Sequence, residues 1–113
     1  MKIENFEDID AWKEARTLTN EIYELTSDGQ FSKDYGLRDQ IQRASVSIMA
    51  NIAEGFERYH FKDKERFYYQ ARGSVAEVQN FLLLAKDLEF ISKEKCGKLG
   101  DKANEVRQLI NGL

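Results

Sequence analysis

The side chains that could do chemistry in this sequence are few, and the spacing of one pair is typical of a metal site. Glu57 and His60 have the Glu-x-x-His spacing of the helices that hold di-iron centres. A di-iron centre needs two such motifs and further glutamates, and His60 is the only histidine in the chain. We therefore interpret His60 as an exposed or half-buried residue near a helix end, and we predict no metal site and no cofactor.

The other reactive side chains do not form a catalytic motif. The single cysteine, Cys96, falls on an apolar helix face, where a free cysteine usually behaves as a small core residue. The glycines are isolated within helical patterns, so no glycine-rich loop can hold a phosphate. We predict that the chain is not an enzyme. The competing hypothesis is a carboxylate enzyme or metal protein that uses Glu54, Glu57 and Glu77.

Polar residues interrupt two apolar helix faces in the middle of the chain. Because buried polar groups must pair, we expect Asn51 and Glu54 to bond to Ser74 and to nearby backbone. We also expect Arg43 to pair with Glu77 or with Glu54. The first interpretation of this set is a structural network that fixes the register of two helices. The second is a ligand or catalytic acid site.

Basic and aromatic residues gather where the second and third predicted helices meet. Cations that pair with phosphates and rings that stack on bases are the means by which proteins bind single-stranded nucleic acids. The sequence therefore indicates a candidate nucleic-acid site. The alternative is a solvated helix end with local ion pairs, because acidic residues dilute the positive charge. The candidate cations are Arg58, Lys62, Lys64, Arg66 and Arg72, and the aromatic neighbours are Phe56, Tyr59, His60, Phe61, Tyr68 and Tyr69.

The composition indicates that helices position these residues. The 113 residues include no proline, only seven glycines, 42% hydrophobic residues and 33% charged residues. Apolar residues recur every three or four positions in four segments, as they do on amphipathic helices. Gly29 is a natural left-handed stop after the first segment, and Ser32 and Ser92 are the expected N-caps of the second and fourth. The expected helices span about residues 8–26, 32–59, 63–88 and 93–113.

Short connections between these helices determine the predicted architecture. Consecutive helices joined by short loops must run antiparallel. We therefore predict an all-α fold, an antiparallel up-down-up-down four-helix bundle that forms a single domain over residues 1–113.

The third helix has more apolar surface than a monomeric bundle needs. Four consecutive residues beginning at Phe81 cover about 300° of helix surface at ~100° per residue. A stripe that faces one core needs little more than ~100°. We predict that Leu82, Leu83 and Leu84 contribute to an oligomeric interface; the alternative is a broad internal contact. The expected core stripe is Phe67, Ala71, Ser74, Val78, Phe81, Ala85 and Leu88.

Charge and hydropathy exclude other classes of protein. The net charge of −3 argues against a general polyanion-binding protein, whose surface is usually strongly basic. No apolar run approaches the ~20 residues that cross a bilayer, and the polar N-terminus has no signal-peptide core. One cysteine cannot form an internal disulfide. We expect a cytoplasmic protein with no membrane partner.

Four stretches of the sequence resemble a known family. They are Phe6–Trp12, Gly36–Ile48, Asn51–Gly55 and Ala71–Glu77. Together they are similar to the four-helix bundle proteins, also called 23S ribosomal RNA intervening-sequence proteins, a family related to the accessory variability proteins of diversity-generating retroelements. The resemblance implies a small cytoplasmic four-helix bundle that assembles into a ring-like homopentamer.

Two functions follow from the residues and the resemblance together. The leading hypothesis is a non-enzymatic oligomeric binding or scaffold protein, with RNA, a ribonucleoprotein or another protein as its candidate partners. The alternative is a nucleic-acid-binding accessory factor that uses the basic and aromatic residues. The related retroelement proteins are strongly basic pentamers that bind a reverse transcriptase and nucleic acid, whereas this chain is acidic overall.

Overall fold

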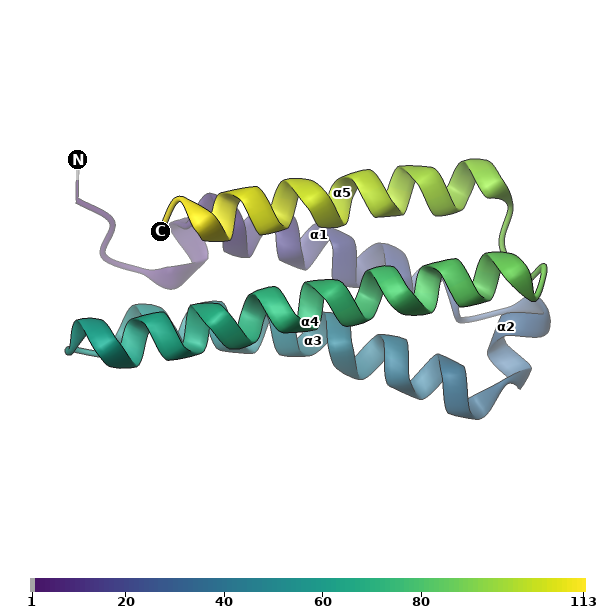
Figure 1. Ribbon diagram of the computed structural model, residues 1–113, viewed down its shortest axis with the longest axis horizontal. Helices are drawn as coiled ribbons and strands as arrows, with labels where there is room; N and C mark the ends of the chain where they lie inside the picture. Colours follow the sequence, from purple (N-terminus) through teal and green to yellow (C-terminus); the bar gives the residue numbers. More distant parts are fainter. Residues whose placement is uncertain (1) are drawn as a thin grey trace.

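The computed structural model describes residues 2–113, and every regular element in that range is a helix (Figure 1). Four long helices lie side by side, and consecutive long helices run antiparallel, which confirms the predicted four-helix bundle. A single-turn 3-10 helix precedes them, and a short helix lies between the first two. The elements are η1 (Phe6–Asp8), α1 (Asp10–Leu25), α2 (Gly29–Lys33), α3 (Tyr35–Glu57), α4 (Phe61–Asp87) and α5 (Lys93–Asn111).

Each long helix packs against two neighbours, so the bundle is a closed square in cross-section. Helix α1 contacts α3 and α5, and α4 contacts the same two helices, so α1 and α4 lie on opposite corners. The α3–α4 contact is the most extensive one in the bundle. The molecule is elongated along the helices, with extents of 43 × 23 × 18 Å.

The core contains apolar residues from every long helix and from α2. Large buried side chains include Leu18 and Ile22 of α1, Ile48 of α3 and Leu99 of α5. On α4 the expected core stripe is confirmed at Ala71, Ser74, Val78 and Ala85, which are buried. Val75 and Leu82 face the core as well, which the expected stripe did not include. Phe67 and Phe81 are half-buried, and Leu88 is exposed.

The ends of the helices confirm one expected cap and correct another. The Ser92 hydroxyl accepts a hydrogen bond from the Lys95 amide at 3.0 Å, so Ser92 is the N-cap of α5 as predicted. Ser32 is not an N-cap. Gly29 adopts the left-handed conformation, with φ of 66°, and its turn leads into α2. The long helix therefore begins later, capped by Asp34.

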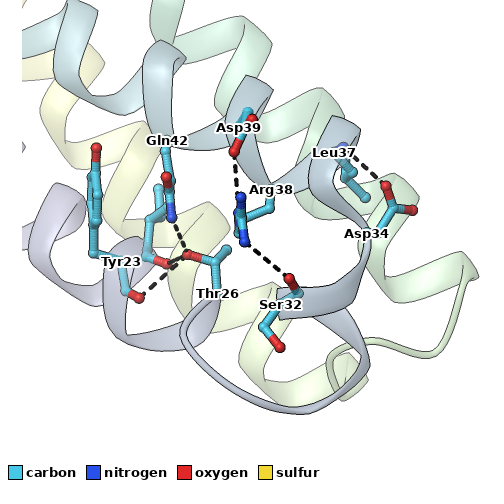
Figure 2. A network of polar contacts seen from close by, with 9 residues as sticks. Tyr23, Thr26, Ser32, Asp34, Leu37, Arg38, Asp39 and Gln42 are labelled. Atoms are coloured by element: carbon cyan, nitrogen blue, oxygen red, sulfur yellow. Dashed lines mark hydrogen bonds and ion pairs between the residues drawn. The ribbon is translucent and has the colours of Figure 1, made fainter.

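A polar network closes the corner between α1, α2 and α3 (Figure 2). The buried Thr26 hydroxyl donates to the Ile22 carbonyl and accepts from the Gln42 amide, each at 2.8 Å. The Arg38 guanidinium donates to the Ser32 carbonyl at 3.1 Å. These bonds satisfy polar groups where the chain reverses direction, which stabilises the corner.

Aromatic packing joins this corner to the other chain reversal at the same end of the bundle. The ring of Phe31, from α2, lies 5.5 Å from the ring of Phe90, in the turn between α4 and α5. Phe31 is only 1% exposed. We call this end, formed by α2, the start of α3 and the α4–α5 turn, the closed end.

Candidate functional site

The opposite end of the bundle presents exposed aromatic rings. The turn between α3 and α4 projects past the end of α5 along the long axis (Figure 1). Tyr59 is 91% exposed, and Phe61 and Tyr69 are each 72% exposed. Single exposed aromatic residues are ordinary, but three close together in sequence are not. We call this end, formed by the α3–α4 turn, residues 61–72 of α4 and the end of α5, the open end.

Local contacts fix the backbone from which these rings project. The Lys64 ammonium donates to the carbonyls of Gly55 and Phe56, at 3.2 and 2.8 Å, and so satisfies the last turn of α3. The ring of Tyr68 lies directly against Gly55. A Cβ atom at Gly55 would lie 2.5 Å from the Tyr68 Cε1, so only glycine permits this contact.

The predicted nucleic-acid residues divide into cations used within the chain and cations that remain available. Lys64 caps α3 as described, and Arg58 forms an ion pair with Glu54 at 3.0 Å. The ion pairs of residues 2–113 leave Lys62, Arg66 and Arg72 without a carboxylate within 4.0 Å. Three of the five predicted cations are therefore free to meet an external anion.

The free arginines lie beside aromatic rings. The Arg66 guanidinium is 4.9 Å from the centroid of the Phe67 ring, and that of Arg72 is 5.8 Å from the Tyr69 ring. Such contacts hold a guanidinium over a ring face while its N–H groups remain available. The open end therefore combines exposed rings with available cations, which is the chemistry that single-stranded nucleic acids require.

A hollow of about 510 Å³ lies within the open end. Burial against its wall raises the pKa of the Tyr68 phenol. Glu65 is the carboxylate among its lining residues, so the hollow is not uniformly basic. The lining residues are Phe61, Lys64, Glu65, Tyr68, Tyr69 and Arg72 of α4, together with Ile110, Asn111 and Leu113.

The predicted polar network exists in part, and its central member is a residue that the sequence did not single out. The Ser74 hydroxyl donates to the Ser47 hydroxyl at 2.9 Å, and the Asn51 amide donates to the Ser47 carbonyl at the same distance. Ser47 thus links α3 to α4. The signal for it was its position four residues before Asn51, on the same helix face.

The charged members of the predicted network lie outside these bonds. Glu54 pairs with Arg58, not with Ser74. Arg43 and Glu77 are exposed on either side of a shallow groove between α3 and α4. No ion pair joins Arg43 to Glu77 or to Glu54 in the described part of the chain, so the predicted pairing of Arg43 is wrong. The reason is that Arg43 and Glu77 project outward from the bundle.

The candidate metal pair is divided by the end of a helix. Helix α3 ends at Glu57, and His60 lies beyond it in extended backbone, so the two side chains do not share a helix face. Within residues 2–113 no group of three or more His, Cys, Asp or Glu side chains could hold a metal ion. Cys96 is buried, with its sulfur 3.5 Å from the Leu82 carbonyl, which confirms its interpretation as a core residue.

Of the residues predicted to form an oligomeric interface, one is buried in the core and two are exposed. Leu82 is 1% exposed and belongs to the core, so its assignment to an interface is wrong. The next two residues are exposed: Leu83 by 53% and Leu84 by 43%. Leu88, one turn further, is 46% exposed. Exposed leucines therefore occupy the last turns of α4, near the closed end.

A groove of about 480 Å³ between α4 and α5 lies beside Leu83. Gly97 and Gly100 of α5 line it, and a Cβ atom at either glycine would meet nothing within 4 Å. Glycine inside a helix costs about 1 kcal/mol relative to alanine. A Cβ atom at either position would lie in open space, so the packing within residues 2–113 does not require glycine there.

Comparisons with known proteins identify a family. The sequence model described as 23S rRNA-intervening sequence protein matches residues 7–112. No curated protein matches the chain. A crystal structure at 1.70 Å resolution, of a protein with unknown function from the S23 ribosomal protein family of Bacteroides thetaiotaomicron, superposes with a TM-score of 0.83. The two chains share 22% identity, and the match covers 90% of this chain and 95% of that one, so it shows the fold alone.

The fold also bears on membranes. No helix within residues 2–113 combines the length and the apolar character that a bilayer-crossing segment needs.

Proposed function

The chain belongs to the 23S rRNA-intervening sequence protein family, and from that premise we propose that it is a non-enzymatic scaffold of the cytoplasm that assembles into a homopentamer. The family and the similar crystal structure carry no known activity. The observation that carries the proposal is the exposure of Leu83, Leu84 and Leu88 on a helix whose core face is already filled. Exposed apolar surface of this kind is typical of protein–protein contacts.

The arrangement of these leucines favours a ring over a two-fold dimer. Leu83 borders the groove between α4 and α5. Leu84 is rotated by ~100° from it and lies on the same face as Phe81 and Glu77, which border the groove between α3 and α4. One helix thus offers two different flanks, each with an exposed leucine. A ring needs two different surfaces on each subunit, because its contacts are head-to-tail.

Light scattering coupled to size exclusion tests the proposal. Wild-type protein is expected to have a mass of about five times 13.1 kDa. Leu83→Glu and Leu84→Glu are each expected to reduce this mass toward one chain, because a buried unpaired carboxylate is costly at an apolar interface. Tyr23→Glu is the matched control: Tyr23 is 45% exposed, but it lies on α1, across the bundle from α4. A wild-type monomer at micromolar concentration would overturn the proposal.

A second candidate function is the binding of single-stranded nucleic acid at the open end. The observation that favours it is the combination of Tyr59, Phe61 and Tyr69 as exposed rings with nearby cations. Lys62, Arg66 and Arg72 have no carboxylate within 4.0 Å in residues 2–113. The chain has a net charge of −3. Acidic residues far from the open end repel a nucleic acid there only weakly, because salt screens charges beyond a Debye length of about 8 Å.

Salt-dependent binding tests the second candidate. Lys62→Glu combined with Arg66→Glu is expected to weaken binding of a labelled RNA and to reduce the slope of log affinity against log salt by about 2. Lys64 is excluded from this variant because it caps α3. The control is Lys93→Glu with Lys98→Glu, an equal change of charge on α5. Equal losses in both variants would show that only the net charge matters and would contradict a local site.

A further inference from the structure

The hollow at the open end exists because α4 is longer than the helix beside it. Further along α4, the face toward α5 is covered and its polar groups are paired. The Gln79 amide donates to Asn104 at 3.0 Å and accepts from Arg107 at 3.2 Å. Helix α5 ends at Asn111, and Figure 1 shows α4 continuing past that end. The hollow lies there, between the first turns of α4 and Ile110 and Asn111 of α5.

Three aromatic side chains line the hollow beside charged and polar ones. Phe61 and Tyr69 are 72% exposed, and the ring of Tyr68 packs against Gly55. Aromatic side chains have few rotatable bonds, so they lose little conformational entropy when a planar ligand stacks on them.

The charges of the hollow favour an anionic group at one position. Arg72 is half-buried, has no carboxylate within 4.0 Å in residues 2–113, and lies over the Tyr69 ring. The Lys64 ammonium is already bound to carbonyls of α3. Glu65 on the lining repels a multiply charged free phosphate. The combination suits a neutral ring whose single negative charge lies on a flanking phosphodiester.

The geometry points to a binding site for one base of a single-stranded nucleic acid: the base stacks on Tyr69 and Phe61, and the adjacent phosphate pairs with Arg72. This inference rests on the second candidate function and deepens it, since it names the residues that contact the base. A hollow of about 510 Å³ is within the range of small-ligand sites, about 300–1,000 Å³.

Fluorescence anisotropy with two labelled probes tests the inference. The first probe is a short oligoadenylate, and the second has the same phosphodiester backbone with abasic residues throughout. Tyr69→Ala is expected to weaken oligoadenylate binding by about tenfold or more, the usual loss on removal of a stacking ring. The abasic probe is expected to bind more weakly than oligoadenylate and to bind wild type and Tyr69→Ala equally.

Two further variants separate stacking from general effects. Tyr69→Phe keeps the ring and is expected to retain wild-type affinity. Tyr35→Ala is the matched control, because Tyr35 is also exposed, by 66%, and has the Arg38 guanidinium 4.7 Å from its ring, but it lies at the closed end. Its affinity is expected to be unchanged.

The outcomes distinguish this inference from the function on which it rests. If oligoadenylate binds with salt-sensitive affinity but Tyr69→Ala has no effect, the stacking site is wrong and a nucleic-acid surface of cations alone remains. If neither probe binds wild type, the inference and the second candidate both fail, and the proposed assembly is untouched. Equal losses in Tyr69→Ala and Tyr35→Ala would also contradict the site.

Discussion

The two ends of the bundle are built from similar residues but use them differently. At the closed end Phe31 is buried against Phe90, and the polar groups of the turn are paired by Thr26 and Gln42. At the open end Phe61 is 72% exposed, and free cations lie near exposed rings. An extra helix explains part of the difference: α2 lies in the connection between α1 and α3 at the closed end, whereas residues 58–60 join α3 to α4 without a helix.

The closed end therefore contributes to the stability of the fold, and the open end keeps side chains available for binding. Buried rings and paired polar groups stabilise a chain reversal, whereas exposed rings contribute little to folding. Substitutions at the closed end should therefore change the free energy of unfolding, and equivalent substitutions at the open end should leave it nearly unchanged. The following predictions compare matched residues from regions that differ in packing.

The largest effect is expected for the two phenylalanines. Phe31→Ala should reduce the free energy of unfolding by about 3–5 kcal/mol, because it removes a fully buried ring and leaves a cavity. Phe61→Ala should change it by no more than about 0.5 kcal/mol. Urea denaturation followed by circular dichroism measures both. Similar losses in the two variants would show that the open end is as well packed as the closed end.

A smaller effect is expected when the polar network of the closed end is cut. Thr26→Val keeps the shape of the side chain but removes the hydroxyl that Gln42 and Ile22 use, at a cost of about 1–3 kcal/mol. Thr17→Val is the control: its hydroxyl bonds only to the Lys13 carbonyl on an exposed surface. That substitution should change the free energy of unfolding by less than about 0.5 kcal/mol. If Thr26→Val were neutral as well, the network would not stabilise the corner.

Two glycines of the α3–α4 pair should respond with opposite signs. Gly55→Ala places a Cβ 2.5 Å from the Tyr68 ring, and overpacking of this kind costs about 1–3 kcal/mol, partly offset by better helix propensity. Gly73→Ala meets nothing within 4 Å and should stabilise the helix by about 0.5–1 kcal/mol. Thermal unfolding of both variants provides the measurement. A stabilising Gly55→Ala would mean that Tyr68 does not pack on α3.

The smallest effect concerns pH. Because burial raises the pKa of Tyr68 above the usual 10.0, the folded state holds this proton more tightly than the unfolded state. This proton therefore contributes to the free energy of unfolding below pH 10.0, and the contribution is lost as the pH rises through the raised pKa of Tyr68. Ultraviolet titration of tyrosinate should show a step above the ordinary tyrosine range. Tyr68→Phe should abolish the step and Tyr69→Phe should keep it; a step that survives Tyr68→Phe would contradict the assignment.

The fold was largely predictable from the sequence because long amphipathic helices leave a strong periodic signal. The short helix α2 was not, since five residues are too few to show a period. Its presence also displaced the N-cap from Ser32 to Asp34. Serine and aspartate are both favoured N-cap residues, so residue type alone does not distinguish Ser32 from Asp34. The left-handed turn at Gly29, which leads into α2, makes Asp34 the cap.

The candidate surfaces could be located in the sequence as regions, but the roles of their individual residues could not. The leucine run indicated surplus apolar surface, yet spacing alone could not tell which leucine faces the core; contacts with α5 place Leu82 inward and Leu83 outward. The five candidate cations lie on α4 and in the α3–α4 turn, but whether they bind nucleic acid stays a prediction. Lys64 binds carbonyls at the end of α3, whereas Arg72 stays available. This distinction depends on three-dimensional contacts, which a pattern of charges in the sequence does not show.

Native mass spectrometry of the wild-type protein with excess oligoadenylate tests the central claim, that subunits join through α4 near the closed end and leave the open ends free. The account predicts a homopentamer whose mass increases in steps of one oligonucleotide, with the assembly intact. A monomeric chain, whether or not it carries oligonucleotide, would contradict the assembly. A homopentamer that dissociates as oligonucleotide binds would contradict the separation of the two ends.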